Sequence, residues 1–275
     1  MITLIPYAGL ANRIRCICSV HCFCKDNNID LKLCWPKERS FNATFKSLFE
    51  TSDLDFIVDD NAILNNILYL SPLGHKYSLA SLFAPVFSKK VYTNLLPPEL
   101  INDSNKLSCS INGIDKDIDN IIISYSILYK STPVDNIFVP IKAIRDIINS
   151  NCEKFTDNVI GLHIRRTDHV ISKNATSIDY FEGKVNDLID EHSDLRIFLC
   201  TDDTYVKGRF LKKYGHHIIT YDSVLNRTSY EGIRDAVVEL WTLAHTNEIY
   251  GSFGSSFSKM AARIYNKPYN EIKEK

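Results

Sequence analysis

From residue 158 to the end of the chain, short apolar runs alternate with longer amphipathic stretches. The apolar runs have the length of strands, and the stretches between them repeat their hydrophobic positions with the period of a helix. The pattern predicts strands at 159–164, 196–200, 217–221 and 248–251, and helices at 178–191, 203–214, 230–245 and 256–265. Strands that alternate with helices of this length are joined by right-handed parallel crossovers. We therefore predict a doubly wound parallel sheet in this half of the chain.

The amino-terminal half carries the same alternation in a less regular form. An apolar run at 2–5, a turn at 6–9, a periodic stretch at 12–24 and an apolar run at 31–35 predict strand, loop, helix and strand. Further strands are predicted at 63–70 and 121–129. The prolines between residues 133 and 140 are the strongest boundary signal. We expect one α/β domain over residues 1–135 and a second over residues 136–275.

Composition narrows the class of protein. At 275 residues and 45% hydrophobic content, the chain can bury the cores of two modest domains. The 32 lysines and arginines nearly balance the 33 aspartates and glutamates, so we expect no nucleic-acid partner. No apolar run approaches the roughly 20 residues that span a bilayer, so we expect no integral membrane segment. Five of the eight cysteines lie between residues 16 and 34, four of them where a helix is predicted, which favours buried thiols in a cytoplasmic protein over disulfides or zinc ligands.

Polar side chains with phosphate-binding chemistry follow the predicted strands of the second domain. Ligands of doubly wound sheets bind beyond the carboxyl ends of the strands, and the segments at these ends are 163–168, 201–203 and 251–257. Arg165 and Arg166 carry planar forks of donors that match a phosphate and stay charged. Small residues before the last helix allow its N–H groups, Ser255 and Ser256 to approach an anion. These features predict a diphosphate site; the alternative is a surface cluster of ion pairs.

Glu239 lies within the apolar pattern of the helix predicted at 230–245. A partly buried carboxylate needs hydrogen-bond donors, and the two N–H groups on the Watson–Crick edge of guanine would supply them. The alternative is an ion pair with Arg234, which a spacing of five residues does not favour. The helix therefore adds a candidate purine contact to the phosphate site.

Three segments in the second half of the chain, in the order in which the family carries them, resemble motifs of the GDP-fucose fucosyltransferases. Residues 161–168, GLHIRRTD, are similar to the HxRRxD motif of the α-1,6, nodulation and α-1,2 enzymes. The resemblance continues through 198–203, FLCTDD, and through the acidic helix and Ser-Ser-Phe-Ser segment within 234–262. It returns at 9–13, GLANR, which is similar to the glycine-asparagine loop after the family's first strand.

The resemblance implies a GT-B type of fold, with two Rossmann-like domains facing across a cleft and the nucleotide sugar held by the second. It implies inverting, metal-independent transfer of fucose from GDP-fucose to a sugar hydroxyl of a glycan acceptor, with no cofactor. Arg165 would contact the β-phosphate, His163 the nucleotide, and Glu239 the guanine. The residues that we predict to bind the donor are His163, Arg165, Arg166, Asp202, Glu239, Ser255, Ser256, Phe257, Gly9, Asn12 and Arg13.

The catalytic base is harder to assign. Inverting transfer calls for a group that accepts the proton of the attacking hydroxyl. The α-1,6 enzymes place a glutamate five residues after the aspartate of the motif, whereas this chain has Lys173 there. We rank Asp168 and His169 above Asp179 and Glu182 of the next helix, so the predicted catalytic set is Arg165, Asp168 and His169.

Three other functions fit parts of the pattern. A transferase of the same fold could use another nucleotide sugar, and a metal-dependent transferase could use the Asp53-Leu54-Asp55 triplet. The presence of Lys173 also allows a catalytically silent module that binds nucleotide or glycan. The paired arginines and Glu239 favour GDP-fucose over these alternatives.

Overall fold

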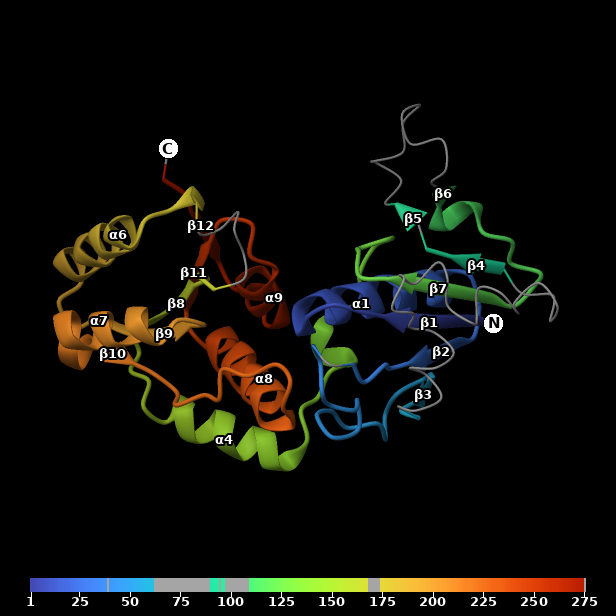
Figure 1. Cartoon of the computed structure of the whole chain (residues 1–275), viewed down its shortest axis with the longest axis horizontal. Coiled ribbons are helices and arrows are strands. Elements are labelled where there is room, and N and C mark those ends of the chain that lie inside the picture. Colours follow the sequence, from blue (N-terminus) through green and yellow to red (C-terminus); the bar gives the residue numbers. More distant parts are fainter. Residues whose placement is uncertain (39, 62–89, 94, 97–108, 168–173, 275) are drawn as a thin grey trace. The chain divides into compact units, whose positions relative to one another are not determined.

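The computed structural model describes residues 1–38, 40–61, 90–93, 95–96, 109–167 and 174–274 (Figure 1). The chain divides into two compact units. The amino-terminal unit comprises Met1–Ile141 and Asn226–Ile233, and the carboxyl-terminal unit comprises Lys142–Leu225 and Arg234–Lys275. Within the described residues each unit contains a five-stranded sheet whose strands all pair in parallel. The predicted α/β class is therefore confirmed.

The sheet of the amino-terminal unit has the strand order β3-β2-β1-β7-β4. Its strands are β1 (Ile2–Pro6), β2 (Leu31–Cys34), β3 (Ile57–Asp59), β4 (Lys90–Tyr92) and β7 (Asn120–Ser124). The helix α1 (Leu10–Asp26) connects β1 to β2, and three of its four cysteines, Cys16, Cys18 and Cys24, are buried free thiols. A separate pair joins β5 (Leu95–Leu96) to β6 (Cys109–Ser110), and the 3-10 helices η5 (Ile111–Gly113) and η6 (Val134–Asn136) flank β7 in the sequence.

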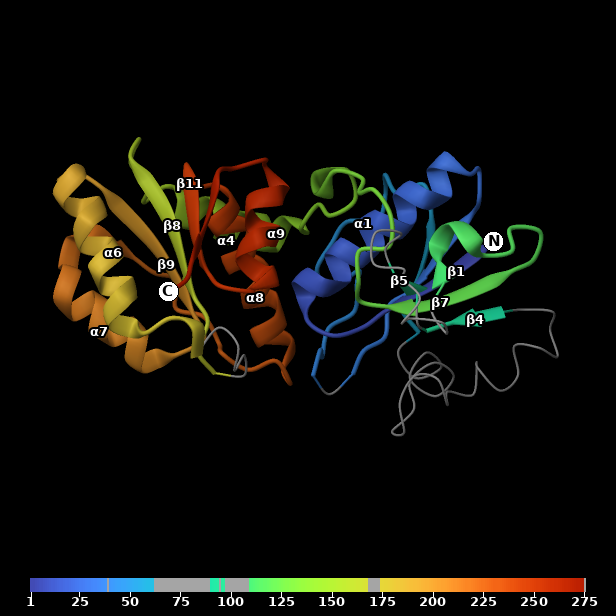
Figure 2. The same cartoon turned by 90° about the horizontal axis from the view of Figure 1, so that it is seen from above.

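The sheet of the carboxyl-terminal unit has the order β10-β9-β8-β11-β12. Its strands are β8 (Val159–Ile164), β9 (Arg196–Thr201), β10 (Ile218–Ile219), β11 (Glu248–Ser252) and β12 (Tyr269–Ile272). The helices α6 (Ile178–Glu191) and α7 (Thr204–Tyr214) cover one face, and α4 (Lys142–Cys152), α8 (Tyr230–Ala244) and α9 (Ser256–Ile264) cover the other (Figure 2). The 3-10 helix η7 (Gly215–His217) leads into β10. The doubly wound sheet that the alternating pattern predicted is present.

Strand β8 shows how this sheet is packed. Ile160, Leu162 and Ile164 belong to the core that contains the side chains of α6 and α7, so the alternate positions face the opposite helices. A Cβ on Gly161 would collide with Leu243 and Thr246, the first on α8 and the second just after it. The glycine therefore allows α8 to pack directly on β8. The same alternation places His163, two residues further along, on the face of α8 and α9.

Several predicted boundaries differ from the structure. The edge strand β10 covers only two of the residues predicted at 217–221, and β7 ends five residues earlier than predicted. Strand β12 was not predicted, because its sequence Tyr-Asn-Glu-Ile is half polar. An edge strand tolerates polar residues, since solvent reaches it on one side. The strand predicted at 63–70 lies outside the described residues. Across the residues with described coordinates, none of the helices has the length and hydropathy needed to cross a membrane.

Candidate functional site

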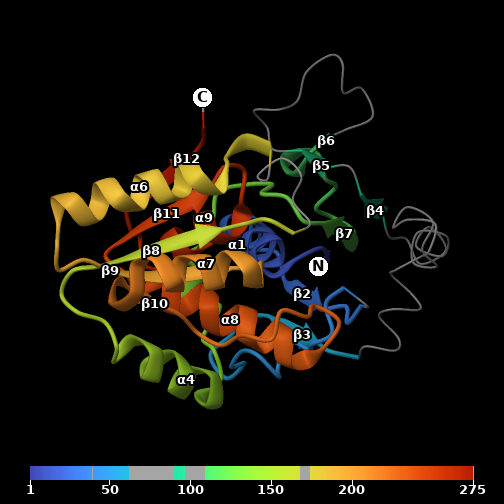
Figure 3. The same ribbon diagram turned by 60° about the vertical axis from the view of Figure 1, so that its left-hand side comes forward.

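The order in which the chain adds strands to the carboxyl-terminal sheet reverses between β8 and β11. The chain runs from β8 through β9 to β10 on one side, then returns to β11 on the other side of β8 (Figure 3). The chain leaves β8 toward α6 and leaves β11 toward α9, which lie on opposite faces of the sheet, so a ligand crevice is expected at the carboxyl ends of these two strands. Crevices at such reversal points are the usual ligand sites of doubly wound sheets. Residues 163–167 and 251–257, both predicted as site segments, meet here.

His163 forms a buried wall of this crevice. It is 4% exposed, and its ring stacks on Phe257 with centroids 5.0 Å apart and an interplanar angle of 28°. Ser255 Oγ lies 3.5 Å from its Nδ1. Burial, assisted by the positive charge of Arg165, lowers the pKa of His163 to about 3, although Asp202 opposes the shift. The imidazole is therefore neutral at physiological pH and can donate or accept a hydrogen bond without carrying charge.

Ser252 ties the end of β11 to the end of β8. Its hydroxyl donates to the carbonyl oxygen of His163 at 3.2 Å and accepts from the backbone N–H of Arg165 at 2.9 Å. Ser252 is completely buried. The hydroxyl thus fixes the backbone from which the Arg165 side chain departs.

The Arg165 guanidinium is oriented by Asp202. Nε of Arg165 lies 3.2 Å from Oδ2 of Asp202, and the arginine side chain keeps 16% of its surface exposed. This contact involves the Nε edge, and a guanidinium carries four further N–H donors on its two Nη atoms. The ion pair therefore restrains the orientation of the Arg165 side chain through its Nε edge.

Asp202 also shapes the loop that carries the arginines. Its Oδ1 accepts from the backbone N–H of Arg166 at 2.7 Å, and its Oδ2 accepts from the hydroxyl of Thr167 at 2.7 Å. Oδ2 is also 3.3 Å from the backbone nitrogen of Thr167. These contacts show that Asp202 positions the loop, and the donor contact that we predicted for it stays a prediction. Arg166 has a similar role, because its Nη1 donates to the carbonyl oxygen of Thr176 at 2.7 Å.

Helix α9 begins at the other side of the crevice. Ser255 occupies its N-cap position, is 4% exposed, and makes no side-chain capping bond. Gly254 turns the chain into the helix with φ = 71°, a conformation that glycine adopts without strain. The first turn, which starts at Ser256, contains no acidic residue, and the Glu271 carboxylate accepts from the backbone N–H of Gly254 at 3.0 Å just before it.

Glu239 lies on α8 as predicted, and its environment shifts its pKa. Burial raises the pKa of Glu239 to about 7; the Ser223 hydroxyl, which donates to Oε1 at 2.9 Å, and the charge of Lys207 oppose the shift. The predicted alternative partner, Arg234, places its Nη2 2.8 Å from Asp235. Glu239 therefore titrates near neutral pH, which suits a carboxylate that gains N–H donors when a ligand binds.

Asp235 and Ser223 were not identified from the sequence. Asp235 is 1% exposed and accepts from the Tyr221 hydroxyl at 3.0 Å and from the backbone N–H of Val224 at 2.8 Å. It holds the segment that follows β10 and thereby positions Ser223 against Glu239. A buried acid inside the apolar pattern of a helix is the signal that would have found it, since such a group must have partners.

The candidate bases divide into two groups. Asp168 and His169 lie outside the described residues, as does Lys173. Glu182 is 6% exposed and accepts from Arg209 Nε at 2.5 Å and Lys213 Nζ at 2.7 Å, and the hydrogen bond from Arg209 lowers its pKa, helped by Lys213. Asp179 pairs with the same arginine at 2.5 Å. The carboxylates of α6 therefore brace α7, which argues against a catalytic role for either.

The glycine-asparagine loop of the amino-terminal unit is held by Arg13. Gly9 is the N-cap of α1, and its carbonyl oxygen accepts from the backbone N–H groups of Asn12 and Arg13 at 3.0 and 3.1 Å. The Arg13 side chain is completely buried. Its Nε and Nη1 donate to the carbonyl oxygens of Ala8 and Pro36 at 2.9 and 2.7 Å.

The Arg13 guanidinium also contacts a carboxylate and two aromatic rings. Nη2 of Arg13 pairs with Glu38, and the guanidinium carbon lies 4.2 Å from the Phe41 ring centroid and 4.9 Å from that of Trp35. We predicted Arg13 as a donor-binding residue; in the structure its side chain is completely buried and bonded within the protein, and the donor contact stays a prediction.

The Asp53-Leu54-Asp55 triplet has a structural use in the same unit. Oδ1 of Asp55 lies 2.8 Å from Nε2 of His21, and Oδ2 lies 2.7 Å from Nζ of Lys25. Within the described ranges, no three histidine, cysteine or acidic side chains gather in a metal-binding arrangement.

Comparison with known proteins adds a fold assignment. No protein-family model matches the sequence, and no curated protein is significantly similar to it. A structure of NodZ α-1,6-fucosyltransferase soaked with GDP-fucose superposes with a TM-score of 0.61 at 13% identity, over 96% of this chain and 92% of NodZ. The apo form of POFUT1 gives a TM-score of 0.60 at 9% identity, over 98% and 97% of the two chains.

A mutant of FUT1 from Arabidopsis thaliana, in complex with GDP, gives a TM-score of 0.63 at 12% identity. The alignment covers 98% of this chain and 70% of FUT1. At such low identity the likeness concerns the fold, and it extends over nearly the whole chain in each comparison. The protein has the α/β fold of these fucosyltransferases.

Proposed function

We propose that the protein is an inverting, metal-independent fucosyltransferase that moves fucose from GDP-fucose to a sugar hydroxyl of a glycan acceptor. The observation that carries the proposal is the position of Arg165 at the carboxyl end of β8, where Ser252 holds its backbone and Asp202 pairs with its side chain next to the neutral His163. The fold of fucosyltransferases that were solved with GDP or GDP-fucose supports it. No cofactor besides the sugar donor is needed for this reaction.

In the proposed reaction, Arg165 neutralises the diphosphate leaving group. An acceptor hydroxyl oxygen forms a bond to C1 of fucose as the bond from C1 to the β-phosphate oxygen breaks, and the electron pair of that bond leaves with GDP. The diphosphate gains negative charge in the transition state, and fixed donors that meet this charge lower the barrier. Ser255, Ser256 and the α9 N-terminus supply further donors, and Arg166 supports the loop.

The nucleoside end of the donor is assigned to Glu239 and His163. Guanine presents two N–H groups that an ionised Glu239 accepts, while the neutral His163 and Phe257 offer a polar and an aromatic surface. Asp168 or His169 takes the proton of the acceptor hydroxyl. The Gly9 and Asn12 loop is proposed to meet the donor through its backbone, since the Arg13 side chain is engaged within the protein.

The decisive experiment measures GDP release from GDP-fucose in the presence of EDTA and a panel of neutral glycan acceptors. Release should depend on an acceptor, and Arg165→Ala should lower kcat by about 10² to 10³. Arg263→Ala, which removes an exposed arginine on α9, is the matched control and should behave as the wild type.

Nucleotide-induced thermal stabilisation separates the alternatives. Binding to the folded state raises the melting temperature, so GDP should stabilise the protein more than UDP or ADP. Stabilisation by UDP in place of GDP would indicate another nucleotide sugar. Stabilisation by GDP without consumption of GDP-fucose by any acceptor would indicate a binding module without catalysis.

A further inference from the structure

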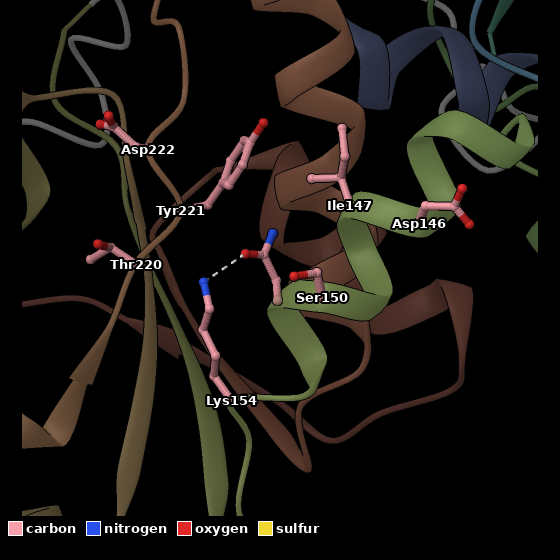
Figure 4. Close-up of a pocket in the computed structure, with 8 residues that line it drawn as sticks. Asp146, Ile147, Ser150, Lys154, Thr220, Tyr221 and Asp222 are labelled. Atoms are coloured by element: carbon pink, nitrogen blue, oxygen red, sulfur yellow. Dashed lines mark hydrogen bonds between the residues drawn. The ribbon is translucent and has the colours of Figure 1, made fainter.

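A second concave region of the carboxyl-terminal unit lies between α4 and the segment that follows β10. The hollow has a volume of about 560 Å³, within the range of small-molecule sites. Asp146, Ile147, Ser150, Asn151 and Lys154 form one wall, and Thr220, Tyr221 and Asp222 form the other (Figure 4). None of these residues takes part in the crevice between β8 and β11, so the hollow is distinct from the proposed donor site.

A buried amide in this hollow has a hydrogen-bond donor that the protein does not satisfy. Asn151 is 4% exposed, and its Oδ1 accepts from Lys154 Nζ at 3.3 Å, the bond drawn dashed in Figure 4. An ammonium group can only donate, so this bond fixes the carbonyl oxygen toward Lys154 and the NH₂ group away from it. Nδ2 of Asn151 finds no acceptor among the described residues. Buried polar groups are nearly always paired, so we expect an acceptor, from a ligand or from water, to meet this amide.

The charges around the hollow are largely compensated. Asp146 pairs with Lys142 at 2.8 Å, and Asp222 lies 3.5 Å from Lys207. The lining itself carries charges of both signs, with Lys154 as its one ammonium beside the two carboxylates. Neither a phosphate nor a cation is favoured by two carboxylates and one ammonium in such an arrangement. The ligand is therefore expected to be neutral.

The remaining groups suit a molecule with many hydroxyls. The Ser150 and Thr220 hydroxyls both donate and accept, the Asn151 amide donates, and the two carboxylates accept. Tyr221 supplies an aromatic ring, which is held in place because its hydroxyl donates to Asp235 at 3.0 Å, and Ile147 adds an apolar contact. Sugar rings combine hydroxyls that both donate and accept with an apolar C–H surface, and they match this set.

We propose that the hollow between α4 and the segment after β10 is a binding site for a neutral saccharide, with the Asn151 amide donating to a sugar oxygen. The site holds its ligand without reacting with it, so it stands whether or not the protein transfers fucose. A glycan bound here would remain on the protein independently of nucleotide.

The test is a titration of the full chain with methyl glycosides of neutral hexoses and N-acetylhexosamines, followed by NMR without nucleotide. At least one saccharide should perturb the hollow residues with a Kd on the order of 1 mM. Asn151→Ala should weaken that binding about tenfold, because it removes a buried hydrogen bond. Asn149→Ala, which removes an exposed asparagine two residues earlier on the same helix, should leave it unchanged.

Ser150→Phe provides a second variant that does not alter the buried amide. Ser150 is exposed at the hollow, so the larger side chain should block saccharide binding while the protein stays folded. The proposal is overturned if no saccharide of the panel perturbs the hollow, which would then hold only water, or if both variants bind as the wild type does. Perturbation by inorganic phosphate instead of saccharides would also overturn it. GDP-induced thermal stabilisation, measured in parallel, reports on the donor site separately.

Discussion

Arg13 and Arg165 occupy similar places in the two units, yet the chain uses them differently. Each follows the first strand of its sheet, β1 or β8. Arg13 is completely buried, with three nitrogens bonded within the protein and its guanidinium against two aromatic rings. Arg165 keeps 16% of its side-chain surface exposed and is aimed through Nε by Asp202. The same residue type therefore stabilises one loop and presents a charge in the other.

The largest expected effect concerns folding stability, from Arg13→Ala. The substitution leaves the carbonyl oxygens of Ala8 and Pro36 without their donor and creates a cavity between Trp35 and Phe41, so the free energy of unfolding should fall by about 3–5 kcal/mol. Denaturant unfolding measures this loss. Lys25→Ala, on the same helix but exposed, should cost less than about 1 kcal/mol. A loss for Arg13→Ala no larger than that of the control would remove the contrast between the two arginines.

Arg165→Lys should have the opposite combination of effects, a large loss of activity with little loss of stability. Lysine keeps the charge but lacks the planar fork, so kcat for GDP release should fall by about 10² to 10³. The free energy of unfolding should change by less than about 1 kcal/mol, because the side chain is partly exposed. Arg263→Lys is the control for a generic arginine change. Full activity in Arg165→Lys would show that only point charge is needed at the crevice.

A smaller effect, about tenfold, is expected from the titration of Glu239. An ionised carboxylate accepts guanine N–H groups, and burial raises its pKa to about 7. GDP affinity should therefore increase roughly tenfold between about pH 6 and pH 8 by calorimetry. The phosphate of GDP also titrates near pH 6, so Glu239→Gln serves as the reference and should lose the part of the dependence that belongs to the carboxylate. Equal pH dependence in both proteins would remove Glu239 from the base-binding site.

The raised pKa of Glu239 also makes the folded state less stable as the pH rises. Because the folded-state pKa of Glu239 is raised, the fold favours the protonated form. This contribution is complete below the ordinary value of 4.5 and is lost as the pH rises through about 7. Relative to Glu239→Gln, the wild type should therefore lose unfolding free energy between about pH 4.5 and pH 8, by up to about 3 kcal/mol for a shift of this size.

The smallest effects should come from the turns beside the two arginines. Ala8 adopts φ = 67° in the loop held by Arg13, whereas Gly254 adopts φ = 71° before α9. A side chain in this region costs about 1–2 kcal/mol, so Gly254→Ala should lower the free energy of unfolding and Ala8→Gly should recover part of the cost paid at that turn. Thermal unfolding of the two variants checks the opposite signs. Equal signs would mean that the turns are not comparable.

The sequence predicted the carboxyl-terminal sheet better than the amino-terminal one for a physical reason. Strand β8 is six residues long and buried throughout. The helices that cover its sheet repeat an apolar face, so the local pattern and the tertiary burial agree. Strands β3 and β4 have three residues each and are only partly buried, which leaves little periodic signal. The half-polar β12 escapes detection for the same reason.

The candidate site was predictable where strand ends determine it. The rule that ligands meet the carboxyl edge of a parallel sheet brought the Arg165 and Ser255 segments together from sequence alone. The use of Arg13 could not be predicted in this way, because Glu38, Phe41 and Trp35 approach it only after the chain has folded. A charged residue has the same appearance in a sequence whether its partners are protein or ligand.

The Ser252 hydroxyl has a consequence for the geometry of the crevice. Backbone pairing between β8 and β11 extends to His163 and Gly251, while Ser252 already pairs with β12. One oxygen atom then bridges the carbonyl of His163 and the N–H of Arg165 where the two strands part. The separation of the two strand ends is thus set by the reach of a single side chain, and β11 continues its pairing with β12 while the last polar groups of β8 remain satisfied.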